Sequence, residues 1–391
     1  MILRLLPILG ITFIDILGFS ILIPLLPFFV KHFGATDVVV GGVFATYSLA
    51  QFVAGPLWGN VSDRIGRKAV LIVSQVGSTI AWAMLGWAPA IAWVFASRLL
   101  EGFSGGNIGV TQAYVGDLVE PKQRGRAFAL VGAAFSAGFV FGPAFGGWLA
   151  AKTTLQVPFF AAAALQLLTL VLTVYLLPDS RKGATEEAAH APTVRDIFTS
   201  LVEPQISPVL WLRLVYTFGM YGWFGVMTLV LNRQLGWGVA ETSYVFAGFG
   251  IMQVILQLTV IGRVTDALGN RVATNLGFVV STVGFVLVPF ATSTPLAIVA
   301  LALFGIGISI ENAAFPALAS DVSPDDRRGT VLGVLSGLDS LAGVVMPPIT
   351  TAVLGAFGVA PAVGIVATLV GVAAVIGIAQ ARSVVPVVSP K

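Results

Sequence analysis

GNVSDRIGRK at residues 59–68 and GRVTDALGNR at residues 262–271 are two versions of one short sequence, separated by 203 positions. Their shared residues include Gly59/Gly262, Asp63/Asp266 and Gly66/Gly269. Further matches recur at a separation of 204: Asp117/Asp321, Arg124/Arg328, Gly125/Gly329 and Pro143/Pro347. A repeat of this length predicts that the chain is built from two related halves.

The sequence around these loops is strongly apolar. Of the 391 residues, 57% are hydrophobic and 10% are charged, against about 25% charged in ordinary soluble domains. Long apolar runs without strand-like alternation indicate transmembrane helices of about 20 residues, not a membrane barrel. The sequence predicts an all-α polytopic membrane protein with about twelve spans, near residues 6–32, 38–60, 69–88, 91–116, 126–150, 157–177, 209–232, 240–262, 272–291, 295–319, 329–355 and 359–381.

One long polar stretch, PDSRKGATEEAAHAPTVRD at residues 178–196, interrupts the spans. It predicts a six-helix bundle at 1–177, a cytoplasmic linker at 178–208 and a second six-helix bundle at 209–391. Because each bundle holds an even number of spans, the two enter the membrane from the same side as parallel repeats around a central cavity.

Lysine and arginine set the expected orientation, because short cytoplasmic loops are enriched in them. One side has sixteen: Arg4, Arg64, Arg67, Lys68, Lys122, Arg124, Arg126, Arg181, Lys182, Arg195, Arg263, Arg271, Arg327, Arg328, Arg382 and Lys391. The other has Lys31, Lys152 and Arg233, and Arg98 and Arg213 fall within spans. Both termini are therefore expected on the cytoplasmic side of the cell membrane, which is the inner or plasma membrane. We also expect the first span to be retained and not cleaved as a signal peptide.

Several function classes are excluded by composition. The chain has no cysteine and two histidines, His32 and His190, which lie at a span end and in the linker. We expect no metal site, no cofactor and no enzyme active site, and without a nucleotide-binding loop the energy source is an ion gradient. The net charge of +3 is spread over short loops, which argues against nucleic-acid binding.

The loop at residues 59–68 suits a conformational latch. Its glycines permit a tight turn, and Asp63 can face a helix N-terminus or Arg67. GNVSDRIGRK resembles the loop signature of the major facilitator superfamily, and the echo at Gly262 strengthens the likeness. The expected latch residues are Gly59, Asp63, Arg64, Gly66, Arg67, Asp117 and Arg124.

The fifth span contains GAAFSAGFVFGPAFGGWL, with glycines at four-residue steps. Small residues so spaced let another helix approach closely. The pattern also resembles the signature of the superfamily's antiporter branch, which exchanges drugs for protons. Its residues are Gly138, Gly142, Pro143, Gly146 and Gly147.

The first span contains IDILGFSILIPLLP, which resembles the first-helix pattern of twelve-spanning drug:proton antiporters. Asp15 lies about ten residues into this span, roughly 15 Å deep. A carboxylate at that depth is costly unless it is paired, hydrated or protonated. Asp15 is thus either a structural contact between helices or, as we favour, a group that couples transport to protons or binds a cationic substrate.

The fourth span contains RLLEGFSGGN, in which Arg98 and Glu101 share one helix face. The sequence around Arg98 resembles the superfamily's fourth-helix signature, although glutamine is more usual at Glu101. The two residues form either a self-neutralising structural pair or, slightly favoured, a proton relay in which Arg98 keeps Glu101 or Asp15 ionised.

Other polar residues are candidates for the cavity wall. By resemblance, the first, fourth, seventh and tenth spans line the cavity, which favours Glu311, while Asp339 is more ambiguous. Arg213 lies only about five residues into its span, a position from which an arginine side chain extends to the interface. The full set of cavity candidates is Glu311, Asn312, Asp339, Tyr221, Gln253, Gln257 and Asn107.

Among the antiporters, the chain resembles tetracycline exporters, with departures. Ala81, Gln253 and Ser281 occupy positions where those exporters carry Asp, His and Asp, which puts tetracycline–metal exchange in doubt.

The favoured hypothesis is a secondary transporter, functional as a monomer, that exports a small lipophilic or cationic compound in exchange for protons by alternating access. A proton symporter or facilitator for a sugar, organic acid or amino acid is the alternative, and a sensor or scaffold without transport is the third class. Because Glu311 and Asp339 have no matching acids in the first half, we expect proton handling in the first half and solute choice in the second.

Overall fold

The computed structural model describes residues 2–105, 110–111, 114–115, 118–119, 124–178, 199–323 and 328–383. Within these residues the chain is helical and contains no strand. By length and composition, eleven of the described helices can cross a membrane. The predicted spans are confirmed for these eleven, and the span expected at 91–116 is described without a gap as far as Gly105.

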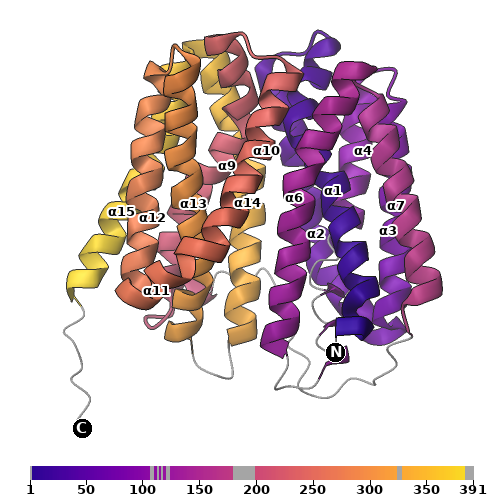
Figure 1. Cartoon of the computed structure of the whole chain (residues 1–391), viewed down its shortest axis with the longest axis horizontal. Helices are drawn as coiled ribbons and strands as arrows, with labels where there is room; N and C mark the ends of the chain where they lie inside the picture. The colour runs from indigo at the N-terminus through magenta and orange to yellow at the C-terminus, as the bar shows by residue number, and fades with distance from the viewer. Residues whose placement is uncertain are drawn as a thin grey trace.

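The helices form two bundles that stand side by side (Figure 1). The first contains α1 (Ile2–His32), α2 (Asp37–Ile65), α3 (Arg67–Gly86), α4 (Ile91–Ser104), α6 (Arg124–Lys152) and α7 (Val157–Leu176). The second contains α9 (Ser207–Leu235), α10 (Val239–Leu256), η2 (Gln257–Ile261), α11 (Gly262–Leu268), α12 (Asn270–Leu287), η3 (Val288–Phe290), α13 (Thr294–Val322), α14 (Arg328–Phe357) and α15 (Val359–Ser383). Most of the linker expected at 178–208 lies outside the described residues, and α9 begins at Ser207.

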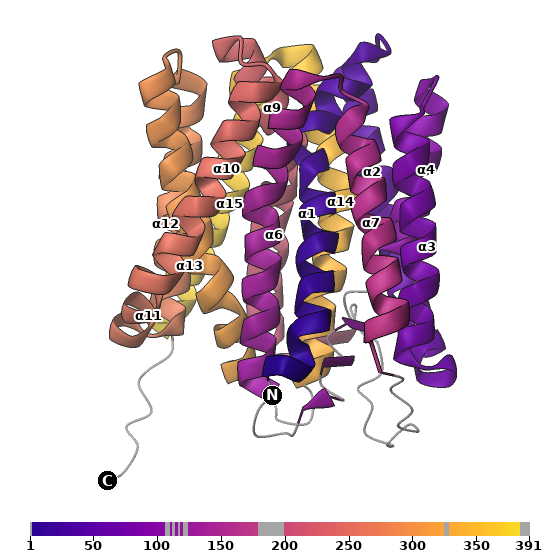
Figure 2. The same ribbon diagram turned by 45° about the vertical axis from the view of Figure 1, so that its right-hand side comes forward.

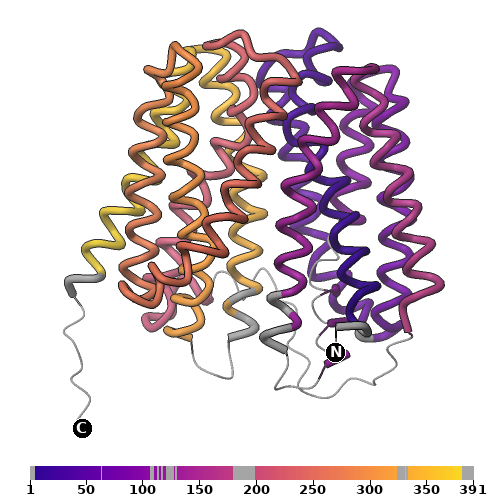
Figure 3. Tube along the Cα trace, viewed as in Figure 1, coloured from indigo at the N-terminus to yellow at the C-terminus, as the bar shows by residue number. Residues whose placement is uncertain are grey.

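The start of α1 and the end of α15 lie on the same side of the molecule, as the tube in Figure 3 shows. Because α1 runs away from this side, α2 begins on the opposite side and returns to it. These two sides are called the termini side and the opposite side below.

The bundles contact each other mainly through two helix pairs, α2 with α14 and α6 with α10, and α1 and α2 make smaller contacts with α9 and α10. Figure 2 shows α6 and α14 on either side of α1, in the middle of the molecule. A Cβ at Gly41 of α2 would lie 2.5 Å from the Pro347 carbonyl oxygen and 2.7 Å from Pro348 Cα, and a Cβ at Gly250 of α10 would lie 2.6 Å from Val140 Cα. Such close backbone approach needs small residues.

Helices α2 and α10 both begin on the opposite side, and Gly41 and Gly250 lie in the half of each span that is nearer to that side. There the two bundles are also joined by an ion pair between Asp37 and Arg233, and Asp37 accepts a second contact of 2.6 Å from Lys31 of its own bundle. The structure thus holds its two halves together on the side opposite the termini.

The antiporter-like glycines of α6 pack against α1. A Cβ at Gly138 would lie 2.6 Å from the Phe13 carbonyl oxygen, and one at Gly146 would lie 2.8 Å from Ile21. Gly142 lies against Ser20, whose hydroxyl donates to the Gly138 carbonyl at 3.0 Å. Of the remaining signature residues, Pro143 is buried in the same helix and Gly147 faces Ser243 of the second bundle.

The repeated loop has the same backbone in both halves. Gly66, between α2 and α3, has φ 96°, and Gly269, between α11 and α12, has φ 75°. The Gly66 N–H donates to the Ser62 carbonyl and the Gly269 N–H donates to that of Thr265. Positive φ explains why both positions hold glycine, and the sequence repeat is a structural repeat here.

The latch residues are only partly described. Asn107 and Asp117 lie outside the described residues, as do the side chains of Asp63 and Arg124. Gly59 is half-buried, Arg64 is exposed, and Arg67 donates to the hydroxyl of Ser62. In the second half, Asn270 donates to Asp321 at 2.8 Å. By the repeat, the matching first-half residues are Arg67 and Asp117.

Candidate functional site

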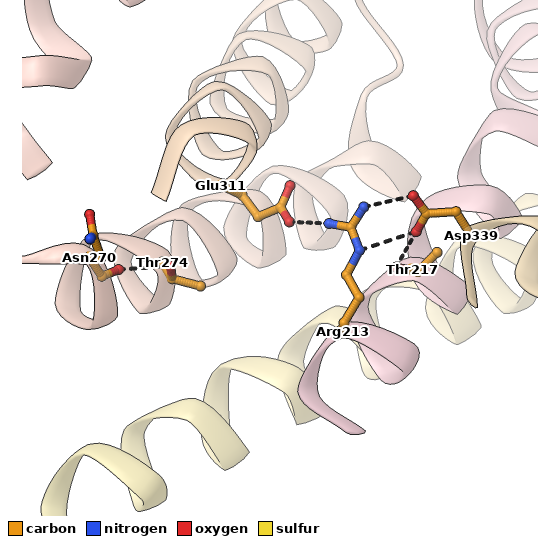
Figure 4. A network of polar contacts seen from close by, with 6 residues as sticks. All are labelled: Arg213, Thr217, Asn270, Thr274, Glu311 and Asp339. Atoms are coloured by element: carbon orange, nitrogen blue, oxygen red, sulfur yellow. Dashed lines mark hydrogen bonds and ion pairs between the residues drawn. The ribbon is translucent and has the colours of Figure 1, made fainter. Parts of the chain in front are cut away.

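The second half contains a cluster of three charged side chains, the triad Arg213, Glu311 and Asp339 (Figure 4). Arg213 of α9 donates through Nε and Nη2 to the two oxygens of Asp339, at 3.1 and 2.9 Å, and through Nη1 to Glu311 at 2.5 Å. The bidentate contact uses the planar fork of the guanidinium group. The expected extension of Arg213 to the interface is therefore wrong, because its side chain turns into the bundle to pair with two carboxylates.

The three side chains differ in exposure. Glu311 of α13 is 1% exposed, Arg213 is 18% exposed and Asp339 of α14 is 27% exposed. The ring of Phe315 lies 5.3 Å from the Arg213 guanidinium carbon, in cation–π contact. Asp339 is thus the accessible member of the triad and Glu311 the enclosed one.

Hydroxyl groups surround the carboxylates. Thr217, one turn along α9 from Arg213, donates to Asp339 at 3.2 Å. Tyr216 of α9 lies beside Glu311 and Ser281 of α12. Tyr216 is 2% exposed and Ser281 is fully buried. Neither hydroxyl makes a hydrogen bond of good geometry within the described part of the chain.

The first half carries its own charges, arranged differently. Arg98 is 1% exposed and Glu101 5% exposed. The guanidinium carbon of Arg98 stacks over the Trp82 ring at 4.7 Å. Among the described residues, all three guanidinium nitrogens lack a hydrogen-bond partner, as does Glu101 Oε2. The self-neutralising pair considered from the sequence is therefore absent as a direct ion pair, although the two charges still face each other.

Asp15 belongs to the same region. It is half-buried on α1 and faces Gln166 and Thr169 of α7, while its Oδ1 atom has no well-formed hydrogen bond to any described residue. Asp15 also contributes to the electrostatic environment of Glu101. The structure thus brings together Asp15, Arg98 and Glu101 as the sequence analysis expected.

Two tyrosines connect the charges of the two halves. Tyr47 of α2 lies near Arg98 and Glu101, and its hydroxyl accepts a hydrogen bond from Gln51 at 3.3 Å. Tyr221 of α9 lies near Asp339 and Tyr47. Tyr221 was predicted from the sequence as a cavity residue, but Tyr47 was not. The available signal for Tyr47 was a Tyr and a Gln spaced by four residues in an otherwise apolar span.

The other cavity candidates do not join this arrangement. Asn312 is exposed although its neighbour Glu311 is buried. Gln253 of α10 is half-buried, and Gln257 is exposed at the start of η2, a π-helical turn. Such turns are frequent at functional sites.

The two halves are more alike in charge than the sequence comparison suggested. Each contains one buried or partly buried arginine with two carboxylates: Arg98 with Asp15 and Glu101, and Arg213 with Glu311 and Asp339. The positions do not correspond in the repeat, which is why aligning the halves hid the likeness. Intramembrane charges of this kind mark solute or ion pathways.

A multi-pass helical membrane protein with two repeated bundles and buried charges within each of them is a transporter by fold and site. The chain belongs to the Major Facilitator Superfamily, whose sequence profile matches residues 8–231 and 209–387. Members of this family are membrane transporters and not enzymes. The chain is therefore a membrane-embedded transporter of a small-molecule substrate.

The chain is similar to named transport and resistance proteins. The chain is 32% identical over 372 residues to "Tetracycline resistance protein, class C" of Escherichia coli, covering 89% of each chain. It is 27% identical over 264 residues to "Multidrug resistance protein 2" of Bacillus subtilis strain 168, covering 66% of each. A solved bacterial homolog of the human lysosomal transporter Spinster superposes with a TM-score of 0.79 at 15% identity, covering 97% of this chain and 96% of that one.

Proposed function

We propose that this protein exports a small lipophilic or cationic, drug-like compound in exchange for protons. The observation that carries the proposal is the set of carboxylates Asp15, Glu101, Glu311 and Asp339, buried or partly buried in transmembrane helices and arranged around two arginines. Carboxylates at this depth are the groups able to take up and release protons there. The names of the tetracycline and multidrug resistance relatives support export of drug-like compounds.

In this proposal Asp15, Arg98 and Glu101 couple transport to protons. Asp15 is half-buried, and it lies close enough to Glu101 to influence its charge. Arg98 makes no fixed hydrogen bond within the described residues, so its charge is free to respond to protonation of either acid. The solute passes between the bundles, near Tyr47 and Tyr221, whose aromatic faces suit an apolar or cationic compound.

The exchange would work by alternating access. The two bundles rock about the midplane, and the contacts of α2 with α14 and of α6 with α10 would part on the opposite side when that side opens. From the lysine and arginine distribution, we infer that the termini side is cytoplasmic and that the protein lies in the inner or plasma membrane. A monomer contains the whole pathway.

Tetracycline itself is a test compound and not an assumed substrate. Ala81 is fully buried in α3 and Ser281 lies beside Tyr216, so neither position supplies the acid that the tetracycline exporters carry there. A compound recognised mainly by apolar and aromatic contact fits the described residues better than a metal chelate does.

The experiment is a growth-inhibition panel in an efflux-deficient bacterial host. The host expresses wild type, Asp15→Asn, or Glu241→Gln, which changes an exposed acid at the start of α10. Wild type and Glu241→Gln should raise resistance to the same lipophilic or cationic compounds, and Asp15→Asn should not. No protection by any compound, together with uptake of a metabolite driven by an inward proton gradient, would favour the symporter instead.

A further inference from the structure

The triad in the second half carries an unbalanced charge. Arg213 supplies one positive charge to the two carboxylates of Glu311 and Asp339, so the ionised cluster has one negative charge too many. Burying an uncompensated charge is expensive, and Glu311 is 1% exposed. A single proton is the smallest ligand that removes the imbalance.

The surroundings of Glu311 can accommodate a carboxyl group in both its ionised and its protonated state. An ionised carboxylate only accepts hydrogen bonds, whereas a protonated one also donates. The hydroxyls of Tyr216 and Ser281 lie beside this site, are nearly or fully buried, and make no well-formed hydrogen bond to a described residue. Buried hydroxyls normally have partners. Each of these two can donate to an ionised carboxylate and can accept from a protonated one, so the site offers partners to the acid in either state.

The site also has a route for the proton. Asp339, at 27% exposed, is the open side of the triad, and its carboxylate shares Arg213 with Glu311. The other titratable groups that face the two acids are tyrosines of α9: Tyr216 lies beside Glu311, and Tyr221 lies beside Asp339. Tyr47 of α2 lies beside Tyr221. α12 contributes the neutral Ser281 and α13 the ring of Phe315.

We propose that Arg213, Glu311 and Asp339 form a proton-binding centre of their own, so that this transporter has a second protonation site in its C-terminal half, separate from Asp15. The proton comes from water at the Asp339 side and forms one O–H bond on a carboxylate of the triad. Arg213 then keeps a single ionised partner. The role of this second site in transport rests on the proposed function, whereas proton binding by the triad can be measured without a transported solute.

Proton binding at the triad would change the packing between the two halves, where α14 contacts α2. Asp339 lies one turn before Gly343 on α14, and a Cβ at Gly343 would lie 2.9 Å from Ser48 Cβ of α2 and 3.1 Å from Tyr221 Cδ1. Releasing Asp339 from Arg213 loosens α14 at this contact. The centre is therefore placed to link protonation in the second half with movement of α14 against α2.

The test counts buried carboxyl groups that take up a proton, and it needs no transported solute. Infrared difference spectra between alkaline and acidic pH are recorded for purified full-length protein, because a protonated carboxyl group has its own carbonyl band. The background is the double variant Asp15→Asn/Glu101→Gln, which removes the first-half acids. We expect this double variant to retain a carboxyl band shielded from solvent exchange, and to take up one proton fewer when Asp339→Asn is added.

The variants are chosen so that folding does not obscure the result. Asp339→Asn leaves Arg213 paired with Glu311, and Glu311→Gln leaves Arg213 paired with Asp339, so each keeps a balanced ion pair. Each should abolish the band, whereas Glu241→Gln should retain it. Absence of a shielded band from the folded double variant would overturn the inference, as would its persistence in both triad variants. A chain that moves no drug but shows the band would contradict the proposed function alone.

Discussion

Arg233, at the end of α9, pairs with Asp37, at the start of α2, and so ties the second half of the transporter to the first across 196 positions of sequence. Arg233 also donates to the Leu354 carbonyl of α14 at 2.6 Å. Asp37 is 4% exposed and receives Lys31 as a second cation. This small ionic cluster closes the opposite side at the point where α1, α2, α9 and α14 meet.

We predict that Asp37→Asn favours opening of the opposite side, because the substitution removes the charge that attracts Arg233. The chain has no cysteine, so spin labels can be placed without background at Trp87→Cys and Phe290→Cys, which are exposed positions in different halves. Electron spin resonance should show a larger population of long distances. Lys31→Gln is the matched control, since Lys31 belongs to the same half as Asp37. Equal distance distributions in wild type and Asp37→Asn would contradict the role of this pair.

We predict that Gly142→Ala destabilises the protein by about 1–3 kcal/mol, as overpacking does. The added Cβ would collide with Ser20 and lie 2.5 Å from the Leu17 carbonyl oxygen. Gly132→Ala in the same helix is the control, because its Cβ meets nothing within 4 Å and alanine is the better helix former. Thermal unfolding in detergent measures both. A Gly142→Ala midpoint as high as that of Gly132→Ala would show that α6 does not depend on this contact with α1.

We predict that Arg213→Gln is the most destabilising single change in the triad, at about 3–5 kcal/mol, because it leaves two buried or partly buried carboxylates without their cation. Thr217→Val removes one neutral donor to Asp339 and should cost about 1–3 kcal/mol. Denaturation followed by tryptophan fluorescence ranks the two variants. If Thr217→Val proves the more damaging, the ion pairs do not organise these three helices.

We predict that Gly66→Ala and Gly269→Ala have similar costs, of about 1–3 kcal/mol, since both residues combine a positive φ with an extended ψ, a conformation almost restricted to glycine, and an added Cβ at either meets nothing within 4 Å. Their effects on transport should differ, because only Gly66 adjoins the loop that matches the full signature. Unfolding midpoints and export rates of the two variants separate these effects. A large difference in stability would mean that the two loops are not structural equivalents.

Much of the fold could be predicted from the sequence, because a span must contain enough apolar residues to cross the bilayer and must end where charge or a turn begins. Helices such as α7 and α13 start within a residue of the predicted positions. The repeat of Gly66 and Gly269 was visible for a similar reason, since only glycine accepts that backbone readily.

Side-chain partners could not be predicted in this way. Depth along a helix suggested that Arg213 reaches the interface, whereas its rotation about the helix axis points it at Asp339, which is 126 positions away in sequence. The pairing of Asp37 with Arg233 and the approach of Tyr47 to Tyr221 likewise depend on how the two bundles dock. Such contacts between distant segments leave no local periodicity in the sequence.

The exchange of protons for solute is the central claim, and it is tested most directly in vesicles that contain the purified protein, a pH gradient and a pH-sensitive dye. Adding a compound identified by the growth panel should speed collapse of the gradient for wild type and for Glu241→Gln, but not for Asp15→Asn. Equal acceleration by Asp15→Asn, or export by wild type without any movement of protons, would contradict the account.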